Sequence, residues 1–311
     1  MLAFVFPGQG AQKVGMGREL FEASAAARTT FEEADAALGE SLSSLIFEGP
    51  QEDLTLTANT QPAILTVSIA ALRALKEQSG DLSPSFVAGH SLGEFSALVA
   101  AGAIDFADAV KTTRARGTFM QQAVPAGEGA MAAVMKKTPE EIADACRQAA
   151  EGDVVSPANF NSPAQVVISG KKAAVERASA LLAQSGGRVI PLKVSAPFHC
   201  ALMEPAASGL DGYLADVQLS SPSVPVVTNV EATPNTDGAR VRELLVRQVT
   251  SPVRWTESVQ QMIKDGVTTF VELGPGNVLA GLIRKIDSSA KVISVSTPSA
   301  VDSALEELAS T

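Results

Sequence analysis

Short apolar runs alternate along the chain with longer stretches in which apolar residues recur at helical spacing. The run Leu2–Phe6 ends at Pro7 and predicts a first strand. Apolar residues recur at helical spacing from Pro62 to Lys76, and Gly80 is placed to end that helix. The alternation favours an α/β architecture with a parallel sheet. The patterns predict strands over 2–6, 86–88, 224–230, 268–273 and 292–295, and helices over 62–76, 94–101 and from Gly274–Gly276 to about Lys285.

The stretch 130–192 has its own order of elements. Thr138, followed by Pro139 and by Glu141, is the signature of a capped helix start. The surrounding periodicities predict strand, helix, strand, strand, helix and strand, which is the order of a ferredoxin-like (βαββαβ) unit. They place strands over 130–134, 154–158, 165–169 and 188–192, and helices from 138 and over 173–184.

The length of 311 residues fits about two domains. We expect the ferredoxin-like unit to be a small inserted domain over 128–195. The large domain is then discontinuous, formed by 1–127 and 196–311. Segments rich in Pro, Gly or small residues, 125–129 and 195–197, are the expected crossings between the two domains.

The charge balance excludes several classes of partner. The chain has 24 basic and 34 acidic residues, a net charge of −10, which argues against binding to nucleic acid and against electrostatic docking on an anionic membrane.

No apolar run is long enough to span a membrane, and the N-terminus lacks the basic segment of a signal peptide. Two cysteines, Cys146 and Cys200, fit a reducing compartment. We expect a cytoplasmic protein.

The motif Gly-x-Ser-x-Gly occurs at Gly89–Gly93, between a predicted strand and a predicted helix. This is the setting of a nucleophile elbow, in which a sharp turn lifts a serine above the edge of the sheet. The pattern indicates Ser91 as a nucleophile and the N–H of Leu92 as a donor to an oxyanion. The alternative is a helix-capping serine between two turn glycines.

A serine nucleophile needs a base, and the chain has two histidines. The side chain of His90 should point away from that of its neighbour Ser91. His199 follows the serine in the order found in α/β-hydrolases, although a structural histidine is the alternative. No acid stands out as the third member of a catalytic triad; Asp105 and Asp108 are candidates only by their position in the sequence.

Two further features lie where a serine site would need them. Gln9, between two glycines after the first strand, could supply a second oxyanion N–H, or belong to a plain turn. Arg114 and Arg116 lie on the helix after the elbow helix. Most arginines are solvated surface charges, but one beside the nucleophile would select an acyl group that bears a carboxylate.

Five motifs together closely resemble the malonyl-CoA:acyl carrier protein transacylases. They are Phe6–Gln12, Gly89–Glu94, Ala158–Pro163, Phe198–Cys200 and Glu272–Gly276, in this order and across the whole chain. The resemblance implies a large α/β-hydrolase-like domain with an inserted ferredoxin-like domain. It implies Ser91 as nucleophile, His199 as base, Gln9 and Leu92 as oxyanion donors, Arg116 as the clamp of the malonyl carboxylate, and Gln248 as the residue whose main-chain carbonyl orients the histidine.

The activity implied is transfer of a malonyl group from malonyl-CoA to the phosphopantetheine thiol of acyl carrier protein, which supplies fatty-acid synthesis. The reaction needs no metal or redox cofactor, and we expect the enzyme to be a monomer. The alternatives are a polyketide-pathway acyltransferase and a serine thioesterase or hydrolase. Because carrier proteins are acidic, docking needs a local basic patch. Its candidates are Lys136, Lys137, Lys171, Lys172, Arg188, Arg284 and Lys285.

Overall fold

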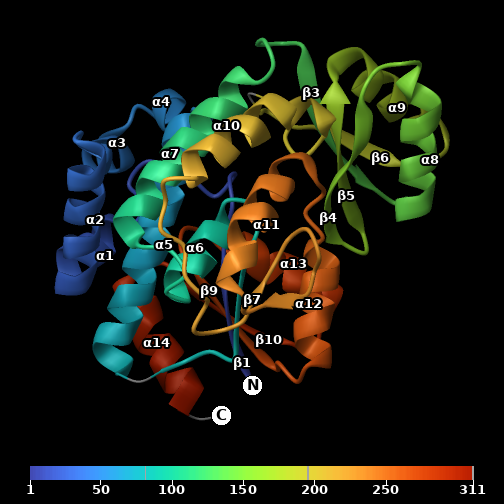
Figure 1. The fold of residues 1–311 in the computed structure, drawn as a ribbon. Helices are drawn as coiled ribbons and strands as arrows, with labels where there is room; N and C mark the ends of the chain where they lie inside the picture. The colour runs from blue at the N-terminus through green and yellow to red at the C-terminus, as the bar shows by residue number, and fades with distance from the viewer. Residues whose placement is uncertain (81, 195, 310–311) are drawn as a thin grey trace.

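A computed structural model describes residues 1–80, 82–194 and 196–309 of the chain. A large part surrounds a central sheet, and a small part lies to one side of it (Figure 1). The central sheet has six strands in the order β10-β9-β1-β2-β7-β8. Neighbouring strands are parallel except β7 and β8, which are antiparallel. The strands are β1 (Leu2–Phe6), β2 (Phe86–Gly89), β7 (Val226–Val227), β8 (Pro234–Asn235), β9 (Thr269–Leu273) and β10 (Lys291–Val295).

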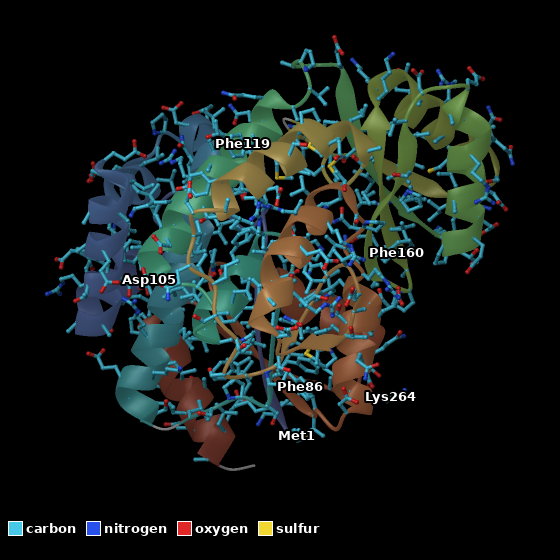
Figure 2. The ribbon with its side chains drawn as sticks, viewed as in Figure 1. Met1, Phe86, Asp105, Phe119, Phe160 and Lys264 are labelled. Carbon is cyan, nitrogen blue, oxygen red and sulfur yellow. The ribbon has the colours of Figure 1, made fainter. Side chains whose placement is uncertain are left out.

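The apolar run of β1 is buried on both faces of the sheet. Phe4 and Phe6 belong to one hydrophobic cluster, whereas Ala3 and Val5 belong to another. Side chains alternate across a strand, so a continuous apolar run is expected where helices cover both faces. Met1 and Phe86, at the amino ends of β1 and β2, lie at the lower edge of the sheet (Figure 2). The carboxyl ends therefore meet at the opposite edge.

Helices form a layer on each face. The cluster of Phe4 and Phe6 takes its helical residues mainly from α2, α5, α6, α7 and α10, while α12 and α13 supply the cluster of Ala3 and Val5. The helices of the large part are α1 (Arg18–Ala23), α2 (Ala25–Leu38), α3 (Leu42–Glu48), α4 (Gln51–Thr55), α5 (Thr57–Ser79), α6 (Gly93–Ala100), α7 (Phe106–Gln122), the 3-10 helix η1 (Ala201–Met203), α10 (Glu204–Leu214), α11 (Gly238–Thr250), α12 (Trp255–Lys264), α13 (Val278–Ile286) and α14 (Pro298–Ala309).

The small part is the ferredoxin-like unit. Its four strands form an antiparallel sheet in the order β4-β5-β3-β6, and α8 and α9 pack on one face of it. The side chain of Thr138 accepts from the Glu141 N–H and the Glu141 side chain from the Thr138 N–H, so the predicted capping box is confirmed. The elements are β3 (Gly129–Met135), α8 (Pro139–Ala150), β4 (Val155–Ser162), β5 (Gln165–Lys171), α9 (Lys172–Gln184) and β6 (Arg188–Pro191).

The fold class is as predicted, but two strands differ from the sequence prediction. The strand expected over 224–230 is only two residues long, because residues 228–233 turn back and β8 pairs with β7. The strand expected over 154–158 extends to Ser162 with irregular register. This extension reaches the large part, where Asn159 forms a bridge with Val253.

The domain boundaries 127/128 and 195/196 stay predictions. Ser195, at the end of the predicted insertion, and Thr311, at the end of the predicted large domain, lie outside the described residues. The main chains of the two parts are nevertheless joined by hydrogen bonds, from Phe160 N–H to Val253 O and from Val253 N–H to Ala158 O.

Candidate active site

The predicted elbow lies at the carboxyl end of β2, where the chain turns into α6. Ser91 has φ 51°, a left-handed conformation that a non-glycine residue adopts only when its surroundings enforce it. The surroundings here are two close contacts. A Cβ on Gly89 would lie 1.9 Å from the main chain of Gly93, and a Cβ on Gly93 would lie 2.1 Å from the carbonyl oxygen of Phe6. Only glycine fits at these positions, and the turn between them carries the serine.

His199, not His90, meets the serine. Its Nε2 lies 2.7 Å from Ser91 Oγ, and its Nδ1 lies 2.9 Å from the main-chain oxygen of Gln248, on α11. A carbonyl oxygen only accepts, so Nδ1 carries the proton and Nε2 is free to accept one from Ser91. Burial, and then the nearby Arg116 guanidinium, lower the pKa of His199 to about 3. The imidazole is therefore neutral at physiological pH, as a base must be.

His90 points elsewhere, as expected from its place beside Ser91 in the chain. Its Nε2 lies 2.8 Å from Oδ1 of Asn161, on β4, and its ring packs against Trp255 with centroids 5.8 Å apart. Burial lowers its pKa. The two acids considered for a catalytic triad lie elsewhere: Asp105 caps α7, and Asp108 pairs with Lys111. Nδ1 of His199 instead contacts the Gln248 carbonyl oxygen.

Arg116 is buried beside Ser91. It is 1% exposed, and its Nη2 donates to Ser91 Oγ over 3.2 Å and to Gln248 Oε1 over 2.8 Å. Its Nη1 donates to Gln61 Oε1 over 2.7 Å, while its Nε has no hydrogen-bond partner among the described residues. Burial lowers the pKa of Arg116 to about 10, which leaves it protonated at neutral pH. Arg114, two residues earlier, instead pairs with Asn59 and Glu40 at the surface.

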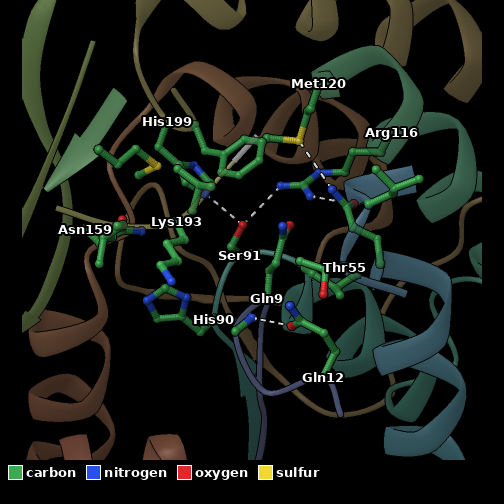
Figure 3. A pocket seen from close by; sticks show the side chains of 18 of the residues that line it. Gln9, Gln12, Thr55, His90, Ser91, Arg116, Met120, Asn159, Lys193 and His199 are labelled. Carbon is green, nitrogen blue, oxygen red and sulfur yellow. Dashed lines mark hydrogen bonds between the residues drawn. The ribbon is translucent and has the colours of Figure 1, made fainter. Parts of the chain in front are cut away.

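The two predicted oxyanion donors face the same cavity. Gln9 lies on the loop after β1 and Leu92 directly before α6, and both line the pocket that holds Ser91 (Figure 3). The side chain of Gln9 is held by a 3.2 Å hydrogen bond to Thr57 Oγ1. Within the described part of the chain, the N–H groups of Gln9 and Leu92 donate to no carbonyl oxygen. They are available to an oxygen atom of a ligand.

The cavity above Ser91 has a volume of about 460 Å³ and walls from both parts of the molecule. The large part supplies Ser91, Arg116 and His199, and β3 and β4 supply Met131 and Asn159. The segment after β6 adds further wall residues, Leu192, Lys193 and Val194. The inserted unit therefore forms part of the binding site itself.

Sequence reasoning assigned no role to three buried polar side chains at this site. Glu94 Oε2 accepts from the N–H of Asn229 over 2.9 Å and from Gln248 Nε2 over 2.8 Å. Asn229 Oδ1 accepts from the N–H of Ser91 over 2.7 Å, and Gln61 holds Arg116. Glu94 had one signal in the sequence, since it is the only charged residue of a mainly apolar helix. Asn229 and Gln61 carry no comparable sequence pattern.

The described residues contain no group of three or more His, Cys, Asp or Glu side chains arranged to hold a metal ion. Over the same residues, every helix is too short or too polar to cross a membrane.

An α/β sheet carrying a serine elbow, with an inserted ferredoxin-like unit over the site, defines a class of serine-dependent acyl-transfer enzymes. The particular family follows from comparison: residues 3–300 match the model of the acyl transferase domain, so the chain belongs to this family.

Named relatives extend over nearly the whole chain. It is 51% identical over 309 residues to the malonyl CoA-acyl carrier protein transacylase of Bacillus subtilis, covering 99% of this chain and 97% of that one. It is 52% identical over 305 residues to the Escherichia coli K12 protein of the same name, covering 98% of each.

Solved structures are also similar to the chain over nearly its whole length. An acyl carrier protein S-malonyltransferase from Vibrio cholerae superposes with a TM-score of 0.95 at 50% identity, over 97% of this chain and 99% of that one. A malonyl-transacylase in complex with its type II polyketide acyl carrier protein superposes with a TM-score of 0.96 at 45% identity, over 98% and 99%. The family resemblance read from the sequence motifs is confirmed.

Proposed function

We propose that this protein transfers a malonyl group from malonyl-CoA to the phosphopantetheine thiol of an acyl carrier protein, through a malonyl ester of Ser91. One observation carries the choice of acyl group. The buried guanidinium of Arg116 lies 3.2 Å from Ser91 Oγ, where the tail of a serine-bound acyl group must sit. A carboxylate on that tail is the natural partner of a buried arginine.

The acylation step uses atoms already in contact. Nε2 of His199 accepts the proton of Ser91 while Oγ forms a bond to the thioester carbonyl carbon. The carbonyl oxygen becomes an oxyanion, for which the N–H groups of Gln9 and Leu92 are the donors. When the tetrahedral intermediate collapses, the C–S bond breaks and the thiolate of coenzyme A takes the proton from His199. The malonyl ester remains on Ser91.

The second step reverses the first with a different thiol. The phosphopantetheine thiol gives its proton to His199 and attacks the ester carbonyl, and Ser91 leaves with the proton. One thioester replaces another, so the overall free-energy change is close to zero and the reaction is reversible. No metal or redox cofactor enters either step.

The side of the Arg116 guanidinium formed by Nε and Nη2 suits the malonyl carboxylate. Nε has no partner among the described residues, and one Nη2–H points to Ser91 Oγ. An arginine pairs with a carboxylate through two parallel N–H donors, and these two nitrogens form such an edge. Carboxylate binding would therefore also satisfy a buried donor that is otherwise unpaired.

Pathway, partner and compartment complete the proposal. Fatty-acid synthesis is the assigned pathway; a polyketide pathway is the alternative, because one relative is solved with a polyketide carrier. The free, buried cysteines Cys146 and Cys200 fit the reducing cytoplasm, and we propose that the enzyme acts there as a monomer. In the proposed basic docking patch, Lys137 and Lys171 are already paired with Glu141 and Asp153.

The test is to trap the acyl-enzyme. The protein is mixed with malonyl-CoA, and mass spectrometry of the digest is expected to show a malonyl adduct on the peptide that contains Ser91. Adding holo carrier protein should then remove the adduct and yield malonyl-carrier protein. Release of free malonate without an acceptor would instead identify a hydrolase, and adduct formation by Ser91→Ala would exclude the nucleophile.

A further inference from the structure

The acyl-transfer steps leave one buried charge at the site without a role. Glu94 is 1% exposed and lies in the first turn of α6, directly after the elbow. Its Oε2 accepts two hydrogen bonds, from the N–H of Asn229 over 2.9 Å and from Gln248 Nε2 over 2.8 Å. A buried carboxylate is costly unless neighbouring donors compensate it, so both donors matter for its ionised form.

The side-chain amide of Gln248 joins Glu94 to Arg116. Its Nε2 donates to Glu94, while its Oε1 accepts from Arg116 Nη2 over 2.8 Å. Nε2 also donates to the main-chain oxygen of Ser91 over 3.1 Å. Together these neighbours fix the orientation of the amide. If it were flipped, its NH₂ group would face the donors of Arg116 and its oxygen would face the carboxylate. Glu94, the charged and nearer of the two acceptors of Nε2, thus favours the orientation that presents the amide oxygen to the guanidinium.

The amide also keeps the two charges apart. Oε2 of Glu94 accepts from Asn229 and Gln248, and among the described residues no ion pair joins Glu94 to Arg116. Burial raises the pKa of Glu94, and the nearby Arg116 charge opposes this shift. A carboxylate bound directly to the guanidinium would occupy donors that an incoming malonyl carboxylate needs. The amide provides an anchoring acceptor at Nη2 and leaves Nε unpaired.

We propose that Glu94 is a positioning residue for malonyl recognition: through the side-chain amide of Gln248, it holds the Arg116 guanidinium beside Ser91. The inference rests on the proposed function. It gives the Gln248 side chain a task distinct from that of its main-chain carbonyl, which binds His199.

The experiment compares Glu94→Ala with Glu94→Gln, using kcat/KM for malonyl-CoA and for acetyl-CoA with holo carrier protein. Alanine removes the charged acceptor and leaves only the Ser91 carbonyl oxygen to hold the NH₂ end of the amide. Malonyl transfer should therefore fall about tenfold to a hundredfold more than acetyl transfer, the usual effect of losing a hydrogen bond to a charged group. Glutamine can place its carbonyl oxygen where Oε2 lies and accept both hydrogen bonds. It should restore the malonyl-to-acetyl ratio to within about threefold of wild type.

A double variant, Glu94→Gln with Gln248→Glu, decides the matter should Glu94→Ala not fold. It conserves size and total charge but puts a carboxylate directly against Arg116. We expect it to lower the malonyl-to-acetyl ratio at least tenfold relative to Glu94→Gln alone, because the guanidinium is then occupied. An unchanged ratio in the double variant overturns the proposal.

Two further outcomes would also overturn it: equal losses for the two substrates in folded Glu94→Ala, or no rescue by Glu94→Gln. Failure of the proposed function looks different. In that case the wild-type protein itself forms no malonyl-Ser91 adduct, whatever residue occupies position 94.

Discussion

At the scale of single residues, Arg116 separates a malonyl site from a general serine site. Arg116→Ala should lower kcat/KM for malonyl-CoA by about a hundredfold or more, because a carboxylate would be buried without its partner. Acetyl-CoA has no carboxylate, so its slow transfer should change little. Arg116→Lys should recover only part of the malonyl activity, since an ammonium cannot reproduce the planar fork.

Arg114→Ala is the matched control for this prediction. It removes the same side chain from the same helix, but Arg114 bonds to Asn59 and Glu40 away from the serine. Both substrates should be transferred by this variant at nearly wild-type rates. If Arg116→Ala slowed malonyl and acetyl transfer in parallel, Arg116 would serve the fold or the coenzyme A moiety, not the carboxylate.

The two histidines make a second residue-scale prediction. His199→Ala should slow acylation of Ser91 by about a hundredfold or more, the usual cost of losing a general base. His90→Ala should slow it less, because His90 bonds to Asn161 and not to Ser91. Pre-steady-state acylation kinetics, at matched thermal stability, measure both. A larger loss for His90→Ala than for His199→Ala would show that His199 is not the base.

The sequence predicted the residues that touch the reacting atoms better than those that hold them. Ser91 was predicted from a short motif, and His199 from the scarcity of histidines together with the family resemblance; the structure places His199 Nε2 2.7 Å from Ser91 Oγ. Asn229 was not found, although it accepts from the N–H of Ser91, 138 positions away. A hydrogen bond between residues so far apart in the sequence leaves no periodic signal along the chain.

At the scale of secondary-structure elements, the elbow depends on Gly93. A Cβ there would lie 2.1 Å from Phe6 O and 2.9 Å from Pro7 O, and both are main-chain atoms. Gly93→Ala should therefore lower the free energy of unfolding by about 2 kcal/mol or more, as overpacking against a rigid backbone does. Chemical denaturation measures this change.

Gly281 on α13 provides the opposite control. A Cβ at Gly281 meets nothing within 4 Å, and alanine favours a helix. Gly281→Ala should raise the free energy of unfolding by up to about 1 kcal/mol. Equal effects of the two substitutions would mean that the elbow is not tightly packed.

Elements were predicted well where burial imposes a simple pattern. β1 is covered on both faces and appears as a short apolar run, and α8 carries a complete capping box. The strand expected over 224–230 failed, because a run of β-branched residues cannot reveal where the backbone leaves the sheet. It leaves after Val227, and this exit brings Asn229 to the elbow.

At the scale of the whole molecule, two buried groups should make the free energy of unfolding change with pH in opposite directions. Burial raises the pKa of Glu94 from 4.5 to about 7, so the folded state binds this proton more readily and gains stability as pH falls from 7 to 4.5. Burial lowers the pKa of His199 from 6.5 to about 3, so the folded state loses stability as pH falls through that interval. The two effects offset each other over their common range.

Glu94→Gln removes only the first effect. The variant should therefore lose more thermal stability than wild type when the pH is lowered from 7 to 5, as measured by the unfolding midpoint. His90, whose pKa is also lowered by burial, acts in the same sense as His199 in both proteins. Parallel curves for the two proteins would show that Glu94 does not titrate differently on folding.

The contact of Gly93 with Phe6 has a consequence for the timing of the reaction. Phe6 ends β1 and leads into the Gln9 loop, whereas Gly93 begins the helix after Leu92. The two predicted oxyanion donors, the N–H groups of Gln9 and Leu92, thus lie on opposite sides of one backbone-to-backbone contact, which forms as the chain folds. Because the donors are already in place, binding of the thioester need not supply free energy to assemble the oxyanion site. No isomerisation of the free enzyme should therefore precede the acylation burst.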